Sequence, residues 1–123
     1  MLLHEATTDV VIAAAIAVHK AMGPGLREYS YANALAIELH EQEVPVVREP
    51  TLQVWYKGTI VGVHRPDFIV DDRVVVEVKA VDALAPVHAR QVLTYLQVSG
   101  LKVGLLVNFN VAALKHGIRR VVL

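Results

Sequence analysis

Charged side chains lie within two apolar segments near the middle of the chain. Asp67 precedes the apolar residues 68–70, while Glu77 and Lys79 lie in the valine-rich segment 74–79. Charges are rarely buried in such surroundings unless a partner or a metal ion offsets the cost of desolvation. These three residues are therefore the first candidates for chemistry. The carboxylate oxygens of Asp67 and Glu77 would suit a divalent cation such as Mg²⁺.

The spacing of the two segments predicts how they pair. Side chains alternate between the two faces of a strand, so Glu77 and Lys79 share one face. If residues 71–73 form a three-residue turn, Asp67 lies opposite Glu77, with the Cβ atoms about 4.5–5.5 Å apart. A two-residue turn would send Glu77 to the other face of the sheet. A shared site therefore requires an odd-length turn or a bulge.

The predicted proximity of Asp67 and Glu77 needs a counter-charge. Two carboxylates at this separation repel each other by about 3 kcal/mol at an effective dielectric constant near 20. Lys79 would offset part of this repulsion, and a divalent cation would offset more. The alternative interpretation is a cross-strand salt bridge between Glu77 and Lys79 on a half-exposed sheet, which requires no metal.

A third carboxylate lies near the start of a helix predicted over residues 26–41. Glu28 precedes Tyr31 by three residues and Leu35 by seven, so it shares the apolar face of that helix. We expect Glu28 to reach the same site. Alternatively, it is a first-turn acid that is favoured by the helix dipole.

A further helix is predicted from Pro86 to about residue 98. Gln91 and Tyr95 lie four residues apart on one face of it, and His88 lies one turn earlier. These side chains could form only the polar edge of an amphipathic helix. Because the helix follows Lys79 closely in the chain, it can also direct Gln91 toward the carboxylates. The other histidines, including His64, show no ligand spacing, and we assign them to surface or packing roles.

The remaining patterns predict an α/β fold with a mixed central sheet flanked by helices. Residues 7–9 offer capping chemistry for a first helix that ends at residues 23–25. Strands are predicted at residues 52–56, 60–64, 67–70, 74–80, 103–109 and 118–123. The strand–helix–strand unit from residue 74 to residue 109 implies a parallel pair with a right-handed crossover.

Composition narrows the class of protein. The 123 residues are sufficient for one domain, 1–123, and the lack of cysteine excludes disulfides, thiolate zinc sites and cysteine nucleophiles.

A net charge of zero is unusual for a protein that binds many phosphates, unless its basic residues gather on one face. Together with 54% apolar residues it suggests a homodimer. No secretory signal or membrane-length apolar run is evident, so we expect a cytoplasmic protein.

Several motifs together resemble a known family. The Gly25-x-x-Glu28-x-x-Tyr31 motif resembles the signature of small bacterial proteins called the GxxExxY family, which is placed in the PD-(D/E)XK nuclease superfamily. Its later blocks are similar to Arg65-x-Asp67 and to residues 77–80, 91–96 and 104–109. The resemblance extends from about residue 10 to residue 122.

This resemblance implies a restriction-endonuclease-like core and an Mg²⁺- or Mn²⁺-dependent nuclease whose expected substrate is DNA. It implies four metal ligands, three from carboxylates and one from a backbone carbonyl: Glu28, Asp67, Glu77 and Val78. Lys79 would be the catalytic lysine. Gln91 and Tyr95 match a Gln-x-x-x-Tyr motif of the RecB-type branch and would position the water or the phosphate.

Two other functions remain open at this stage. The protein could be a catalytically weak nucleic-acid-binding or regulatory module that keeps the nuclease-like fold. It could also be a purely structural partner in a dimer, which would bind neither metal nor nucleic acid.

Overall fold

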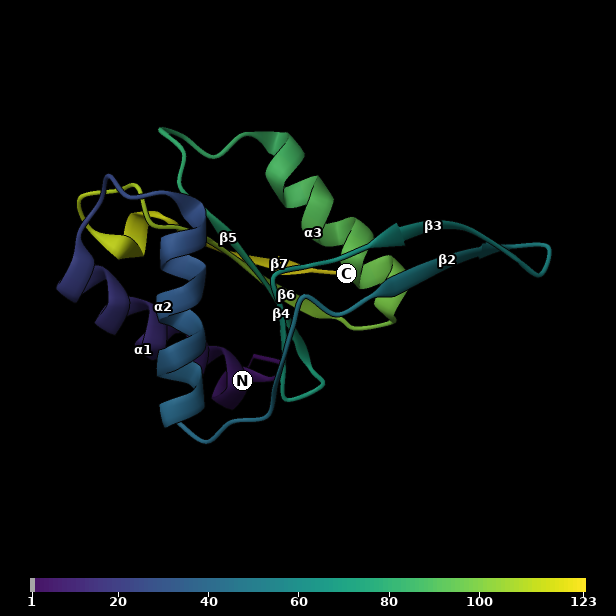
Figure 1. Ribbon diagram of the computed structural model, residues 1–123, viewed down its shortest axis with the longest axis horizontal. Helices are drawn as coiled ribbons and strands as arrows, with labels where there is room; N and C mark the ends of the chain where they lie inside the picture. The colour runs from purple at the N-terminus through teal and green to yellow at the C-terminus, as the bar shows by residue number, and fades with distance from the viewer. Residues whose placement is uncertain (1) are drawn as a thin grey trace.

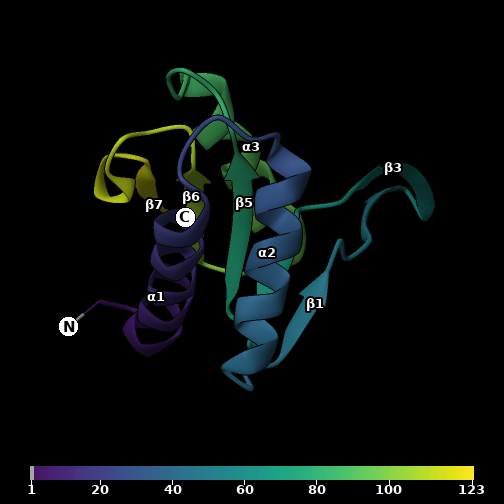
Figure 2. The ribbon, with the colours of Figure 1, turned by 60° about the vertical axis from the view of Figure 1, so that its left-hand side comes forward.

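A computed structural model describes residues 2–123 as a sheet with helices on both faces (Figures 1 and 2). The helices are α1 Glu5–Met22, α2 Glu28–Glu41 and α3 Pro86–Ser99, with a short 3-10 turn, η1, at Leu114–His116. The strands are β1 Val46–Arg48, β2 Leu52–Tyr56, β3 Thr59–His64, β4 Phe68–Val70, β5 Val74–Lys79, β6 Val103–Asn108 and β7 Ile118–Val122.

Five strands form the main sheet in the order β1-β4-β5-β6-β7. β5 and β6 are parallel and the other neighbours are antiparallel, so the predicted mixed sheet and the parallel strand–helix–strand unit are confirmed. β2 and β3 pair only with each other and form a separate hairpin. In both views this hairpin extends beyond the rest of the molecule (Figures 1 and 2).

The central strand β5 is buried on both faces, which explains its run of valines. Val74, Val76 and Val78 pack in the cluster formed with α1 and α2, whereas Val75 packs in the cluster formed with α3. Burial of apolar surface in these two clusters, at about 25 cal/mol per Å², is the main contribution that holds the helices on the sheet. Glu77 and Lys79 therefore lie on the α3 face.

α3 approaches β6 closely at Gly104. A Cβ atom at this position would lie 2.5 Å from Val92 Cγ1 of the helix and 3.4 Å from the Val75 carbonyl oxygen. Only glycine leaves room for this packing. The contact fixes the distance between α3 and the sheet, and therefore the height of Gln91 and Tyr95 above it.

Two details differ from the sequence-based expectation. α1 begins at Glu5, so residues 7–9 do not cap it; Thr7 and Thr8 are buried in the first turns, and the Thr8 hydroxyl donates to the Glu5 carbonyl at 3.0 Å. β1 was not predicted, because it has only three residues between Pro45 and Pro50 and is formed by pairing with β4. Within residues 2–123, no helix has the length and apolar character needed to span a membrane.

Candidate active site

The turn between β4 and β5 has the odd length that a shared site requires. Val70 pairs with Val74 and Phe68 pairs with Val76, so residues 71–73 form a three-residue turn. Asp71 and Asp72 both adopt left-handed backbone conformations, with φ of 54° and 52°. Aspartate tolerates this region better than most residues, because its short polar side chain can bond locally.

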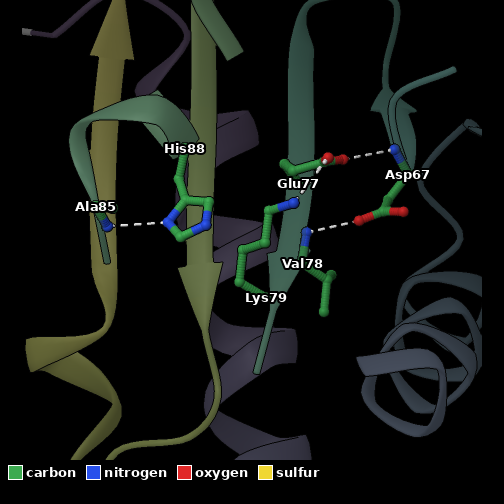
Figure 3. A network of polar contacts seen from close by, with 6 residues as sticks. All are labelled: Asp67, Glu77, Val78, Lys79, Ala85 and His88. Atoms are coloured by element: carbon green, nitrogen blue, oxygen red, sulfur yellow. Dashed lines mark hydrogen bonds and ion pairs between the residues drawn. The ribbon is translucent and has the colours of Figure 1, made fainter. Parts of the chain in front are cut away.

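Beyond this ladder, Asp67 and Glu77 are held by each other's strand (Figure 3). Glu77 Oε1 accepts a hydrogen bond from the Asp67 backbone N–H at 3.0 Å. Asp67 Oδ2 accepts one from the Val78 backbone N–H at 2.7 Å. Lys79 Nζ lies 3.6 Å from Glu77 Oε2, and both of these side chains are largely buried. The two carboxylates and the ammonium group therefore meet where β4 begins and β5 ends.

This arrangement perturbs Glu77. Burial, followed by the negative charge of Asp67, raises the pKa of Glu77 to about 8, although the Asp67 N–H and the Lys79 ammonium act in the opposite direction. Such a pKa means that the ionised form of Glu77 is disfavoured in the metal-free protein. Perturbed groups of this kind are common at functional sites.

Glu28 is the first residue of α2 and lies at the same end of the sheet. Partial burial and the Asp67 charge raise its pKa, while Lys79 and His88 lower it, which places its carboxyl group within electrostatic reach of the pair. Its side chain is nevertheless exposed, unlike those of Tyr31 and Leu35 on the same helix. Across the described residues, no three Asp, Glu, His or Cys side chains lie close enough together to share a metal ion.

Tyr31 fixes the loop that precedes Glu28. Its side chain is fully buried, and its hydroxyl donates to the Gly23 carbonyl at 2.6 Å and accepts from the Leu26 N–H at 3.1 Å. Its ring stacks on Phe109 with 4.6 Å between centroids. In the motif Gly25-x-x-Glu28-x-x-Tyr31, the tyrosine thus positions the start of the helix that carries the acid. The helical spacing identified Tyr31 only as an apolar-face residue.

Two asparagines join the loops around the site, and sequence reasoning missed both. The buried Asn108 side chain accepts from the Val81 N–H at 3.0 Å and donates to the Val81 carbonyl at 2.9 Å. Asn110 accepts from the Gly25 N–H at 3.1 Å and donates to Asp82 at 3.2 Å. The available signal was an amide, Asn108, as the last residue of an otherwise apolar strand, with a second amide, Asn110, two residues later.

α3 brings Tyr95 to the carboxylates. Burial, followed by the charges of Glu77 and Asp67, raises the pKa of Tyr95 to about 12. Hydrogen bonding with Glu77 also raises this pKa, whereas hydrogen bonding with Gln91 lowers it. The His64 ring meets the Tyr95 ring edge-on, with 6.1 Å between centroids. His64, which the sequence analysis assigned to surface or packing roles, therefore contacts a predicted site residue.

His88 lies at the N-terminal end of α3, beside this group. Its Nδ1 accepts a hydrogen bond from the Ala85 N–H at 2.9 Å (Figure 3), so in the neutral ring the proton is on Nε2. A shallow hollow of about 370 Å³ lies along the same helix, lined by Val87, His88, Arg90, Gln91 and Thr94.

The chain belongs to the PD-(D/E)XK nuclease superfamily. The model of this superfamily matches residues 5–121, which is nearly the whole chain. Its members are typically nucleases and generally use divalent metal ions. Neither the curated proteins nor the solved structures contain a match to this chain.

Proposed function

We propose that the protein is a nuclease that hydrolyses phosphodiester bonds of DNA with the help of Mg²⁺ or Mn²⁺. The observation that supports this most strongly is the pairing of Asp67 and Glu77 beside Lys79 at the start of β4 and the end of β5. It joins two acids and a cation where Glu77 and Lys79 are largely buried and Asp67 is half-buried. Such a site favours a divalent ion over two bare negative charges.

The donor groups suit such an ion. An ionised carboxylate has about four acceptor positions, and the backbone N–H groups occupy only part of this capacity on Asp67 and Glu77. Mg²⁺ commonly takes one or two carboxylates together with phosphate oxygens and water. The N–H and C=O of one strand residue point to the same side, so the Val78 carbonyl is directed toward Asp67 and is the proposed third ligand. Glu28 lies too far from Asp67 and Glu77 to share an ion with them in this structure, so its side chain would have to turn toward the pair to complete the set.

A bound divalent ion would polarise the phosphate and would lower the pKa of a coordinated water. In this proposal Lys79 places a fixed positive charge beside the phosphate, where negative charge grows in the transition state. Gln91 and Tyr95 orient the water or the phosphate from α3. The weak hydration around these buried groups strengthens each interaction.

Cleavage of single-stranded, duplex and branched DNA tests the proposal. Wild-type protein should cut at least one of these with Mg²⁺ or Mn²⁺ and none with a chelator. Asp67→Asn, Glu77→Gln and Lys79→Met should each lower the rate by at least about a hundredfold, in line with the loss of one charge-stabilising group. Asp9→Asn changes an exposed acid on α1 and is the matched control. Rates in Asp67→Asn and Glu77→Gln equal to that of Asp9→Asn would exclude this mechanism.

A binding or regulatory module is the second candidate. The observation that favours it is that each carboxylate already accepts a backbone N–H, which satisfies part of the pair without a metal. Calorimetry distinguishes the two. A nuclease of the proposed kind binds Mn²⁺ through Asp67 and Glu77, whereas a module that has lost the activity binds nucleic acid but shows no heat on addition of metal.

A further inference from the structure

The hairpin of β2 and β3 exposes an unusual set of apolar side chains. Trp55 is 59% exposed and Tyr56 is 62% exposed, and three neighbours on β3 are also exposed: Ile60, Val61 and Val63. The hairpin extends beyond the main sheet and the helices (Figure 1). Contiguous exposed apolar surface of this kind marks interaction sites, because it is otherwise unfavourable in water.

One face of the hairpin is covered and the other is not. Leu52 and its partner His64 face α3, where Leu52 packs against the α3 cluster and His64 against Tyr95. Trp55 pairs with Ile60 beyond a register shift at residues 54 and 55. The aromatic part of the hairpin is therefore available to a partner, while its base is anchored beside the candidate active site.

Charge identifies the kind of partner. Residues 51–66 contain Lys57 and Arg65 but no Asp or Glu, and residues 83–123 contain five basic residues and no acidic one. These two stretches together carry seven of the twelve Lys and Arg residues and none of the twelve Asp and Glu residues. Lys115 and Arg120 lie on the α1 side of the sheet, whereas Lys57 and Arg65 belong to the hairpin region and Arg90 lies on α3, which contacts β2. A polyanion complements this side of the molecule, whereas a second copy would bring two cationic hairpins together.

We propose that the β2–β3 hairpin binds single-stranded nucleic acid, with an unpaired base stacked on Trp55 and phosphates near Lys57 and Arg65. Aromatic faces stack on bases of any sequence, and only unpaired bases expose their faces. This inference rests on the proposed nuclease function, because it assigns the substrate form and the surface that holds it.

The chain connects this surface to the site. His64 is the last residue of β3, and Asp67 follows three residues later. From Ile60, the partner of Trp55, to His64 the strand covers about 13 Å at about 3.3 Å per residue. A strand of a few nucleotides is therefore long enough to stack on Trp55 and to place a phosphate near Asp67 and Lys79.

Trp55 is the single tryptophan of the chain, so its fluorescence reports on this surface directly. The protein is titrated in the presence of a chelator with a labelled 12-nucleotide single-stranded DNA, the matching RNA and the matching DNA duplex. Fluorescence of Trp55 and anisotropy of the label are recorded together. We expect saturable quenching by the single strands at the concentrations that raise the anisotropy, and little quenching by the duplex.

Variants locate the effect. Trp55→Ala should weaken single-strand binding by about tenfold or more, as expected for the loss of one stacked base, and Trp55→Phe should lose less. Ile37→Ala removes an apolar side chain that is equally exposed, at 61%, but lies on α2, and it should bind like wild type. The quenching in wild type needs no variant, so the test does not depend on the folding of Trp55→Ala.

Three results would overturn the inference. One is an anisotropy rise without quenching, with unchanged affinity in Trp55→Ala, which would place nucleic acid elsewhere. Another is a fluorescence change with protein concentration alone, together with a dimer in sedimentation that Trp55→Ala abolishes; a second copy would then cover the hairpin. The third is the lack of binding to any oligonucleotide. In each case the cleavage assay with duplex and branched DNA decides separately on the nuclease.

Discussion

Asp67 and Glu77 form a coupled pair in which each acid is held by the backbone of the other's strand. Because Glu77 is buried next to Asp67, its pKa is raised to about 8, well above its ordinary value of 4.5. At neutral pH the metal-free protein therefore keeps Glu77 mainly protonated. Metal binding must release this proton, so occupancy of the proposed site should increase with pH.

The same shift predicts a pH dependence of folding. Between pH 4.5 and 8 the folded protein binds more protons at Glu77 than the unfolded chain does, so this contribution is complete at low pH and is lost as the pH rises through 8. The metal-free wild type should lose up to about 1.4 kcal/mol of unfolding free energy per pH unit in this range. In Glu77→Gln the slope should flatten. Denaturant unfolding at pH 5, 6, 7 and 8 with a chelator measures it.

Asp9→Asn, which changes an exposed acid, is the control for this experiment and should keep the wild-type slope. A slope in Glu77→Gln identical to that of Asp9→Asn would show that Glu77 does not hold its proton in the folded protein.

Tyr31 acts on Glu28 through the loop at residues 23–27. Tyr31→Phe keeps the stacked ring but removes the hydroxyl that bonds to Gly23 and Leu26. The loss of two hydrogen bonds should reduce the unfolding free energy by about 1–3 kcal/mol and lower the cleavage rate through misplacement of Glu28. Tyr29→Phe, two residues away and 63% exposed, is the control. Equal rates in the two variants, with Tyr31→Phe destabilised, would limit Tyr31 to a role in folding.

At the scale of elements, the position of α3 depends on Gly104. Gly104→Ala should push α3 away from β6, because its Cβ would lie 2.5 Å from Val92 Cγ1, and should destabilise the protein by about 1–3 kcal/mol. Gly62→Ala is the control, since its Cβ would meet Val54 at an ordinary 3.8 Å. Adding Val92→Ala to Gly104→Ala makes room for the new methyl group. A double-mutant cycle by thermal unfolding should therefore show a favourable coupling, and strict additivity would contradict the packing argument.

The sequence predicted the elements whose signals are local. The alternation in residues 74–79 left two registers open, because side-chain direction in strands has a period of two. The three-residue turn of the structure selects the register that brings Asp67 to Glu77. β1 could not be predicted, because three residues between prolines carry little periodic signal and the strand depends on a distant partner. The Tyr31 hydroxyl was missed for the same reason: its partners are backbone groups of a loop.

At the scale of the whole molecule, the net charge of zero conceals a strong asymmetry. Residues 1–50 carry seven acidic and three basic residues, whereas the hairpin and the part of the chain after Asp82 carry only basic ones. The sequence contains this distribution, but its meaning depends on the fold, which packs α3 against β2 and β7. The overall charge therefore does not describe the charge of the separate faces, and nucleic-acid binding stays a prediction.

Asn110 links three segments that are far apart in sequence, since its side chain bonds to Gly25 and Asp82 while Asn108 holds Val81. Because these hydrogen bonds tie the same loops together, the loss of one should weaken the others. We therefore expect the loops at Gly25, Val81 and Asp82 to open together and not one at a time.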